Sequence, residues 1–162
     1  MLAVEILVEE ALEAIGEFMN PATFLSRLDH GKISAAIAES ERKTSGEIRV
    51  FISRHKVEDP RSSAEDQFVK LGMSKTKHRN GVLLFFAPLS QKFAMIGDQA
   101  IHEKCGQHHW RKLVDEMQGH LKRDQFTDAI VHGINAAGAL LETHFPADGG
   151  GGNELSNDVA ED

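Results

Sequence analysis

Four side chains that commonly bind divalent cations stand near the ends of apolar runs in this sequence: Glu47, Asn80, Asp98 and His102. Carboxylate and amide oxygens suit Ca²⁺ or Mg²⁺, whereas an added histidine shifts the preference toward Mn²⁺ or Zn²⁺. Arg79, directly before Asn80, would supply a cationic clamp for a phosphate group. If these side chains meet, the chemistry they offer is metal binding or metal-assisted hydrolysis of a phosphate ester.

A buried hairpin is predicted to place two of these residues at one edge of a sheet. Val82 to Ala87 is an unbroken apolar run, which indicates a central strand buried on both faces. Only five residues separate it from a second apolar run, Phe93 to Ile96, and so short a link permits only an antiparallel partner. Asn80 and Asp98 then lie at the same edge.

A parallel crossover is predicted before the hairpin. Residues 47–54 alternate apolar and polar in the manner of a strand. Pro60 opens a helical pattern that ends near Gly72, and a strand, a helix and a strand at this spacing form a right-handed parallel unit. The first strand therefore begins beside Asn80, and Glu47 joins the same edge.

The same residues also allow a purely structural interpretation. Asp98 would cap the N-terminus of a helix, Glu47 would pair with Arg79 or Lys77, and His102 would pack without a function. The candidate catalytic residues are Asp98, His102 and Arg79, but the sequence identifies no nucleophile or base among them.

Other chemical signals in the sequence are weak. Adjacent residues on a helix diverge by about 100°, so His108 and His109 are not expected to form a ligand pair. His78 lies within reach of the edge that precedes the central strand. A single cysteine, Cys105, excludes an intramolecular disulfide. Phosphate-binding glycine loops, a nucleophile elbow and a His-Glu-x-x-His motif do not occur.

Composition is that of one ordinary globular domain with ends. The chain has 162 residues, 41% of them hydrophobic and 27% charged, and a formal net charge of −7. An acidic chain without a basic stripe is not expected to bind nucleic acid.

Helices are predicted around the strands. Asp29 is expected to cap a helix that runs to about Lys43, with Gly46 ending it in the left-handed conformation. Two long amphipathic helices follow the hairpin and end before Pro146. The order of elements predicts an α/β fold, a three-layer α/β/α sandwich whose small mixed sheet has helices on both faces.

The two ends of the chain are predicted to lie outside this domain, which spans residues 21–146. Residues 1–20 follow the spacing of an amphipathic helix that docks on the domain or pairs with a second copy. Glutamates interrupt this segment, so we expect neither a signal peptide nor a membrane span, and a cytoplasmic location. Met19 is an alternative start. Residues 147–162 are glycine-rich and acidic and are predicted to be a disordered tail.

Three stretches resemble the TPM domain family. They are Thr44-Ser45-Gly46-Glu47-Ile48-Arg49-Val50, the run from Arg79 to Pro88, and Lys92-Phe93-Ala94-Met95-Ile96-Gly97-Asp98. The resemblance covers about Ile33 to Phe145. It implies an α/β/α sandwich with a mixed sheet, often with divalent-metal binding, calcium above all. Some plant members are assigned an acid phosphatase activity, and other members act in photosystem repair or receptor modulation.

The chain departs from the family pattern at two acidic positions. Many members have an aspartate where this chain has Arg79, and Gly-Tyr-Gly-Leu-Glu where it has Gly97-Asp98-Gln99-Ala100-Ile101.

The sequence supports two hypotheses for the function. The first is a TPM-type binding or regulatory module that engages a protein partner, membrane-associated or not, with or without a divalent metal. The alternative is a metal-dependent acid phosphatase that hydrolyses phosphomonoesters.

Overall fold

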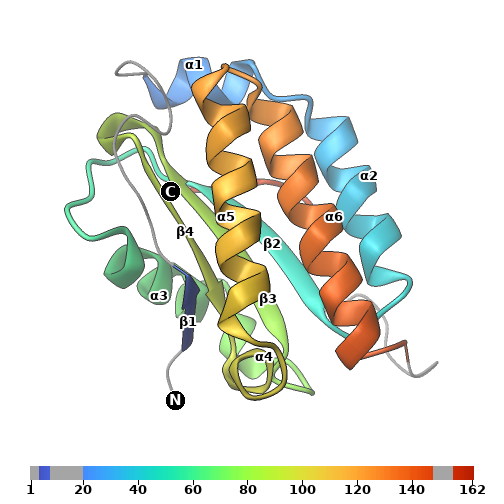
Figure 1. Ribbon diagram of the computed structural model, residues 1–162. Helices are drawn as coiled ribbons and strands as arrows, with labels where there is room; N and C mark the ends of the chain where they lie inside the picture. The colour runs from blue at the N-terminus through green and yellow to red at the C-terminus, as the bar shows by residue number, and fades with distance from the viewer. Residues whose placement is uncertain (1–3, 8–19, 148–154) are drawn as a thin grey trace.

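The sheet at the centre of the molecule has five strands in the order β1-β4-β3-β2-β5. The computed structural model describes residues 4–7, 20–147 and 155–162 (Figure 1). The strands are β1 (Val4–Leu7), β2 (Glu47–Ile52), β3 (Gly81–Ala87), β4 (Lys92–Gly97) and β5 (Ala160–Glu161). β2 and β3 are parallel, and β3 and β4 are antiparallel. Both predicted pairings are confirmed.

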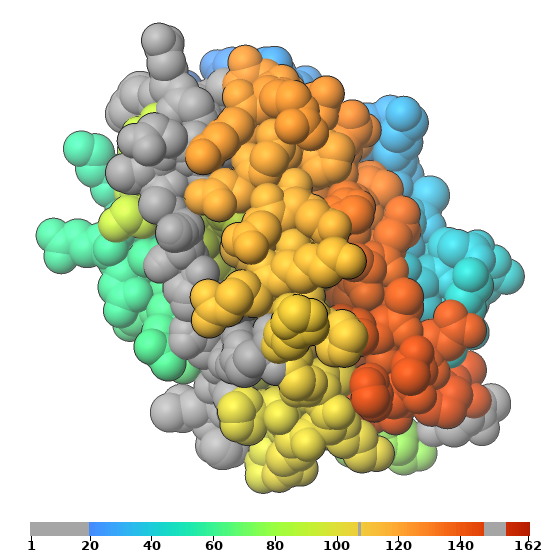
Figure 2. All heavy atoms as spheres, in the orientation of Figure 1, coloured from blue at the N-terminus to red at the C-terminus, as the bar shows by residue number. Residues whose placement is uncertain are grey.

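Helices cover both faces of this sheet. They are α1 (Pro21–Ser26), α2 (His30–Glu41), α3 (Pro60–Lys70), α4 (Gln99–Lys104), α5 (Gln107–Lys122) and α6 (Phe126–His144). The helices α2, α5 and α6 lie on one face, and α3 lies on the other (Figure 1). In Figure 2 the side chains of α5 and α6 form a closed outer surface over the first face. The predicted α/β/α sandwich is confirmed.

Alternation along the central strand divides the core into two layers. Val82, Leu84 and Phe86 pack toward α2, α5 and α6, whereas Leu83 and Phe85 pack toward α3. Every residue of β3 is buried. Because successive side chains point to opposite faces of a sheet, an unbroken apolar run is what a strand covered on both faces requires.

Local signals set the helix ends as predicted, with one exception. The Asp29 side chain accepts a hydrogen bond from the Lys32 amide at 3.0 Å and caps α2, but α2 ends at Glu41. Of the described glycines only Gly72 has a positive φ, +79°, so the left-handed conformation predicted for Gly46 is wrong. Gly46 is instead required by close packing, because a Cβ there would lie 3.0 Å from the Leu141 side chain.

Both ends of the chain differ from the prediction where the structure describes them. Val4–Leu7 form a strand that pairs antiparallel with β4, not part of a helix; the rest of the predicted helix over 1–20 lies outside the described residues. Residues 155–162 are docked, and Ala160–Glu161 pair with β2, so a disordered tail is wrong for them. In both cases a strand edge has taken up backbone groups that would otherwise lack partners.

Within the part of the chain that the structure describes, no helix combines the length and the apolar character needed to cross a membrane.

Candidate functional site

The predicted convergence of residues at one sheet edge is present in the structure. Glu47 pairs in register with Gly81, and Val82 pairs with Gly97, so Glu47, Asn80 and Asp98 surround the same end of the sheet. Their exposed fractions are only 2%, 1% and 0%. Three polar side chains distant in sequence are thus buried together, which is uncommon unless each has partners.

Asp98 is held by Arg79 through two parallel hydrogen bonds. Arg79 Nε donates to Oδ2 and a terminal nitrogen donates to Oδ1, both at 2.8 Å. The Gln99 amide also donates to Oδ1, at 2.7 Å, which makes Asp98 the N-cap of α4. These bonds raise the pKa of the Arg79 guanidinium. Both carboxylate oxygens are therefore occupied by a planar cation whose geometry matches them.

The backbone at Arg79 has an uncommon conformation and makes bonds of its own at this edge. Its φ is +53°, in the left-handed region that side chains other than glycine rarely adopt. The Arg79 carbonyl accepts a hydrogen bond from the Ala100 amide at 3.2 Å, and the Asp98 amide donates to the Gly81 carbonyl at 3.0 Å. Side-chain and backbone bonds together tie the start of β3 to the start of α4.

Glu47 and Asn80 also have internal partners. Glu47 Oε1 accepts a hydrogen bond from the Leu155 amide at 3.1 Å. Asn80 Nδ2 donates to the Ser45 hydroxyl at 3.1 Å, while its Oδ1 is buried without a partner. His102 is exposed, unlike fully buried Asp98. The structural interpretation is thus right about the Asp98 cap, and Arg79 pairs with Asp98.

Two charged side chains beside this edge were missed by sequence reasoning: half-buried Glu41 and buried Arg49. Glu41 Oε2 accepts from the Ile48 amide at 2.7 Å, and Oε1 is buried without a partner. Burial, reinforced by the charge of Glu47, raises the Glu41 pKa to about 8. Arg49 is only 9% exposed, its Nε lacks a partner, and burial lowers its pKa. The only sequence signal was a charged residue inside the strand pattern of residues 47–54.

Comparison with known proteins decides the family. The family model described as TPM domain matches residues 18–140. The chain belongs to the TPM domain family. This TPM domain is also similar to a solved structure, the BA42 protein of the psychrophilic bacterium Bizionia argentinensis, determined by NMR. The two chains are 31% identical with a TM-score of 0.76, over 93% of this chain and 100% of BA42. No curated protein matches the chain significantly.

The residues predicted to bind a metal in this TPM domain do not fit a divalent cation as they are arranged. Both oxygens of Asp98 face the Arg79 guanidinium, and a cation there would meet a positive charge. The described residues contain no group of three His, Cys, Asp or Glu side chains arranged to bind a metal ion. A cation at Asp98 would compete with Arg79 for a fully buried carboxylate.

The remaining candidates of the sequence are a buried thiol and three exposed histidines. Cys105 is buried, and burial raises the pKa of its thiol, which makes it a poor nucleophile. His78, His108 and His109 are exposed. The rings of His108 and His109 lie edge to face, with centroids 5.7 Å apart, at the start of α5.

Proposed function

We propose that this TPM domain is a non-catalytic binding module that engages an extended segment of a partner protein at the edge of its sheet. The observation that carries the proposal is the bidentate bond between Arg79 and Asp98. A carboxylate whose two oxygens are both bonded to a guanidinium is poorly suited to bind a divalent cation, because its charge is already balanced.

The outer helical surfaces offer little for a partner to bury. Among the described large hydrophobic side chains only Val69 on α3 is exposed, at 46%. A stable complex on a helix face needs a contiguous apolar patch. A sheet edge needs none, because its backbone groups supply most of the affinity. This comparison favours the sheet edge as the contact surface.

Divalent-metal binding by Glu47, Asn80, Asp98 and His102 stays a prediction, and the binding module does not depend on it. Calorimetric titration of the metal-stripped protein with Ca²⁺, Mg²⁺, Mn²⁺ and Zn²⁺ tests metal binding. A phosphomonoester hydrolysis assay with each metal then tests the phosphatase alternative. We expect no saturable heat and no hydrolysis above the blank, because Arg79 already neutralises Asp98.

Two matched variants make this result decisive. Asp98→Asn keeps a capping side chain but removes the charge at the candidate edge. Asp59→Asn makes the same change at the cap of α3, where Asp59 bonds the Arg61 amide. Metal binding and turnover that survive Asp59→Asn and disappear in Asp98→Asn would overturn the proposal in favour of the phosphatase.

A further inference from the structure

Residues 155–162, which we name the docked segment, lie along the outer edge of β2. Within this segment Ala160 pairs with Phe51 and Glu161 pairs with Ile52, both in parallel register. The segment extends the sheet by strand addition, the way in which several domains bind extended peptides of other proteins. The edge of β2 therefore accepts an extended chain, and the docked segment occupies it in this structure.

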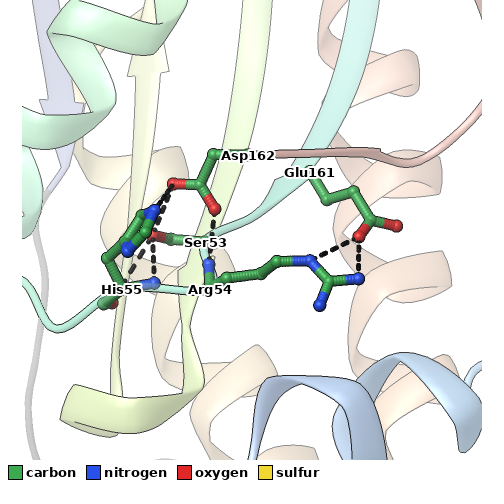
Figure 3. A network of polar contacts seen from close by, with 5 residues as sticks. All are labelled: Ser53, Arg54, His55, Glu161 and Asp162. Carbon is green, nitrogen blue, oxygen red and sulfur yellow. Dashed lines mark hydrogen bonds and ion pairs between the residues drawn. The ribbon is translucent and has the colours of Figure 1, made fainter.

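Acidic side chains hold the end of the docked segment to the chain that follows β2 (Figure 3). Asp162 Oδ1 accepts from the Arg54 amide at 2.6 Å, and Oδ2 accepts from the Ser53 hydroxyl at 3.0 Å. Glu161 Oε1 accepts from Arg54 Nε at 2.7 Å. His55 lies 3.9 Å from Asp162 and adds charge when protonated.

The first half of the docked segment is held by α2 and by buried groups of β2. The Ser34 hydroxyl donates to the Asn157 carbonyl at 3.2 Å, and a terminal nitrogen of Arg49 donates to the Asp158 carbonyl at 3.4 Å. Apolar contacts alternate as in a strand at the end of the segment, because Val159 packs into the layer of α2, α5 and α6 and Ala160 into the α3 layer. Backbone, charge and apolar contacts together make a built site.

We propose that the edge formed by Ser34, Arg49, Ser53, Arg54 and His55, which we name the β2 acceptor edge, binds an extended acidic segment of a partner protein. The docked segment is its tethered occupant, which the partner displaces. This inference rests on the proposed function and names the surface and the partner chemistry. The positive groups of the acceptor edge complement Asp158, Glu161 and Asp162 of the occupant, and such complementarity selects acidic partners.

Several features make the occupant displaceable. Only two residue pairs form its ladder, and its ion pair with Arg54 is exposed, which gives it little stability. Its apolar side chains Leu155 and Val159 are only partly buried. The docked segment is therefore held weakly enough to exchange.

Arg49 gives a partner the means to bind better than the tethered occupant. The Arg49 side chain is almost fully buried, its Nε has no partner, and its bond to the Asp158 carbonyl is long. A buried guanidinium with unmatched donors costs free energy. A partner segment that places a carboxylate on Arg49 would recover this cost, so we expect Arg49 to discriminate among acidic sequences.

A second copy of the chain is disfavoured as the occupant. The docked segment of a second copy would make the same contacts as the tethered one. It would lack the effective concentration, roughly millimolar, that covalent linkage through a short connection supplies. Only a segment of different sequence, matched to Arg49, gains anything by exchange.

The test uses the full chain and a fluorescent peptide with the sequence of residues 155–162, followed by fluorescence anisotropy. The double variant E161K/D162K places positive charge against Arg54 and releases the tethered occupant without changing the acceptor edge. We expect it to bind the peptide at least about fivefold more tightly than wild type, since competition from the tether is removed. High salt should weaken this binding.

Two further variants locate the binding on the acceptor edge. Adding Arg54→Glu to the E161K/D162K variant should weaken its affinity for the peptide by about tenfold. The new glutamate repels the side-chain carboxylates of the last two residues of the peptide. Arg42→Glu, at an exposed residue after α2 that pairs with Glu39, is the matched control and should leave the affinity unchanged. Far-UV circular dichroism verifies that each variant is folded.

Two outcomes would overturn the inference. One is a folded, released variant that binds the peptide no better than wild type. The other is a wild-type dimer whose population rises with concentration and disappears in E161K/D162K, which would assign the edge to a second copy. Neither outcome affects the metal titration, so failure of this inference is distinguishable from failure of the non-catalytic proposal.

Discussion

Two arginine–carboxylate pairs in this TPM domain have the same chemistry and opposite exposure. In the pair of Arg79 with Asp98, the side chains are 32% and 0% exposed. In the pair of Arg54 with Glu161, they are 46% and 40% exposed. The first joins β3 to α4 inside the fold, and the second holds the docked segment to the surface.

This difference assigns the two pairs different roles. Removing one partner of a buried pair leaves a charge without solvent or counter-ion, whereas an exposed pair gives up little when it opens. The Arg79–Asp98 pair is therefore a fixed structural bond, although it lies where the sequence predicts chemistry. The Arg54–Glu161 pair can exchange partners, and it belongs to the surface that we propose for binding.

The largest expected effect is the loss of stability in Arg79→Met. The substitution leaves the Asp98 carboxylate fully buried beside an apolar side chain, which should lower the free energy of unfolding toward the lower end of ~3–5 kcal/mol, because Arg79 is partly exposed. Urea unfolding measures it. Arg54→Met is the matched control and should cost at most ~1 kcal/mol. Equal losses in the two variants would contradict the comparison.

A smaller effect is expected at Glu41, which lies beside β2 and combines burial with an unpartnered oxygen. Its pKa is about 8 in the folded protein and near the ordinary value when unfolded, so the folded state retains a proton that the unfolded state has lost. Stability should therefore fall as pH rises from about 4.5 through 8. Glu41→Gln removes this titration and should stabilise the protein at pH 8.5 by ~1–3 kcal/mol.

The measurement is thermal unfolding of wild type and Glu41→Gln across this pH range. Glu39→Gln is the control on the same helix, because Glu39 is exposed and its pKa is lowered by Arg42; it should retain the wild-type loss of stability above pH 5. Parallel curves for wild type and Glu41→Gln would show that Glu41 does not titrate as a buried acid.

Much of the sheet was predictable because its signals are local. The unbroken run from Val82 to Ala87 identified the central strand, and the short link after it allowed only a hairpin. Parallel and antiparallel pairing then fixed which strand ends meet, so Glu47, Asn80 and Asp98 were placed together by topology alone. The sequence therefore located the candidate edge without any knowledge of side-chain contacts.

The partners within that edge were not predictable, because they depend on distances between elements. Arg79 bonds Asp98 from a residue whose own backbone is in the left-handed region, which no spacing rule anticipates. The docked segment was also missed, since acidic residues after a glycine run have the composition of a disordered tail. Its structure comes from the unpaired edge of β2, a property of the assembled sheet.

The smallest expected effect is a change in hydrogen exchange, which distinguishes local opening of the docked segment from global unfolding. If the Arg54 pair only holds that segment, Arg54→Ala should speed hydrogen exchange at the amides of Ala160 and Glu161 by several-fold while those of β3 keep their protection. The matched variant Arg42→Ala should change neither set, because the Arg42 side chain is exposed and pairs with Glu39 of α2. Faster exchange throughout β3 would instead make the docked segment an integral part of the core. In that case a partner could displace it only by unfolding the domain, and the distinction between a fixed pair and an exchangeable pair would no longer hold.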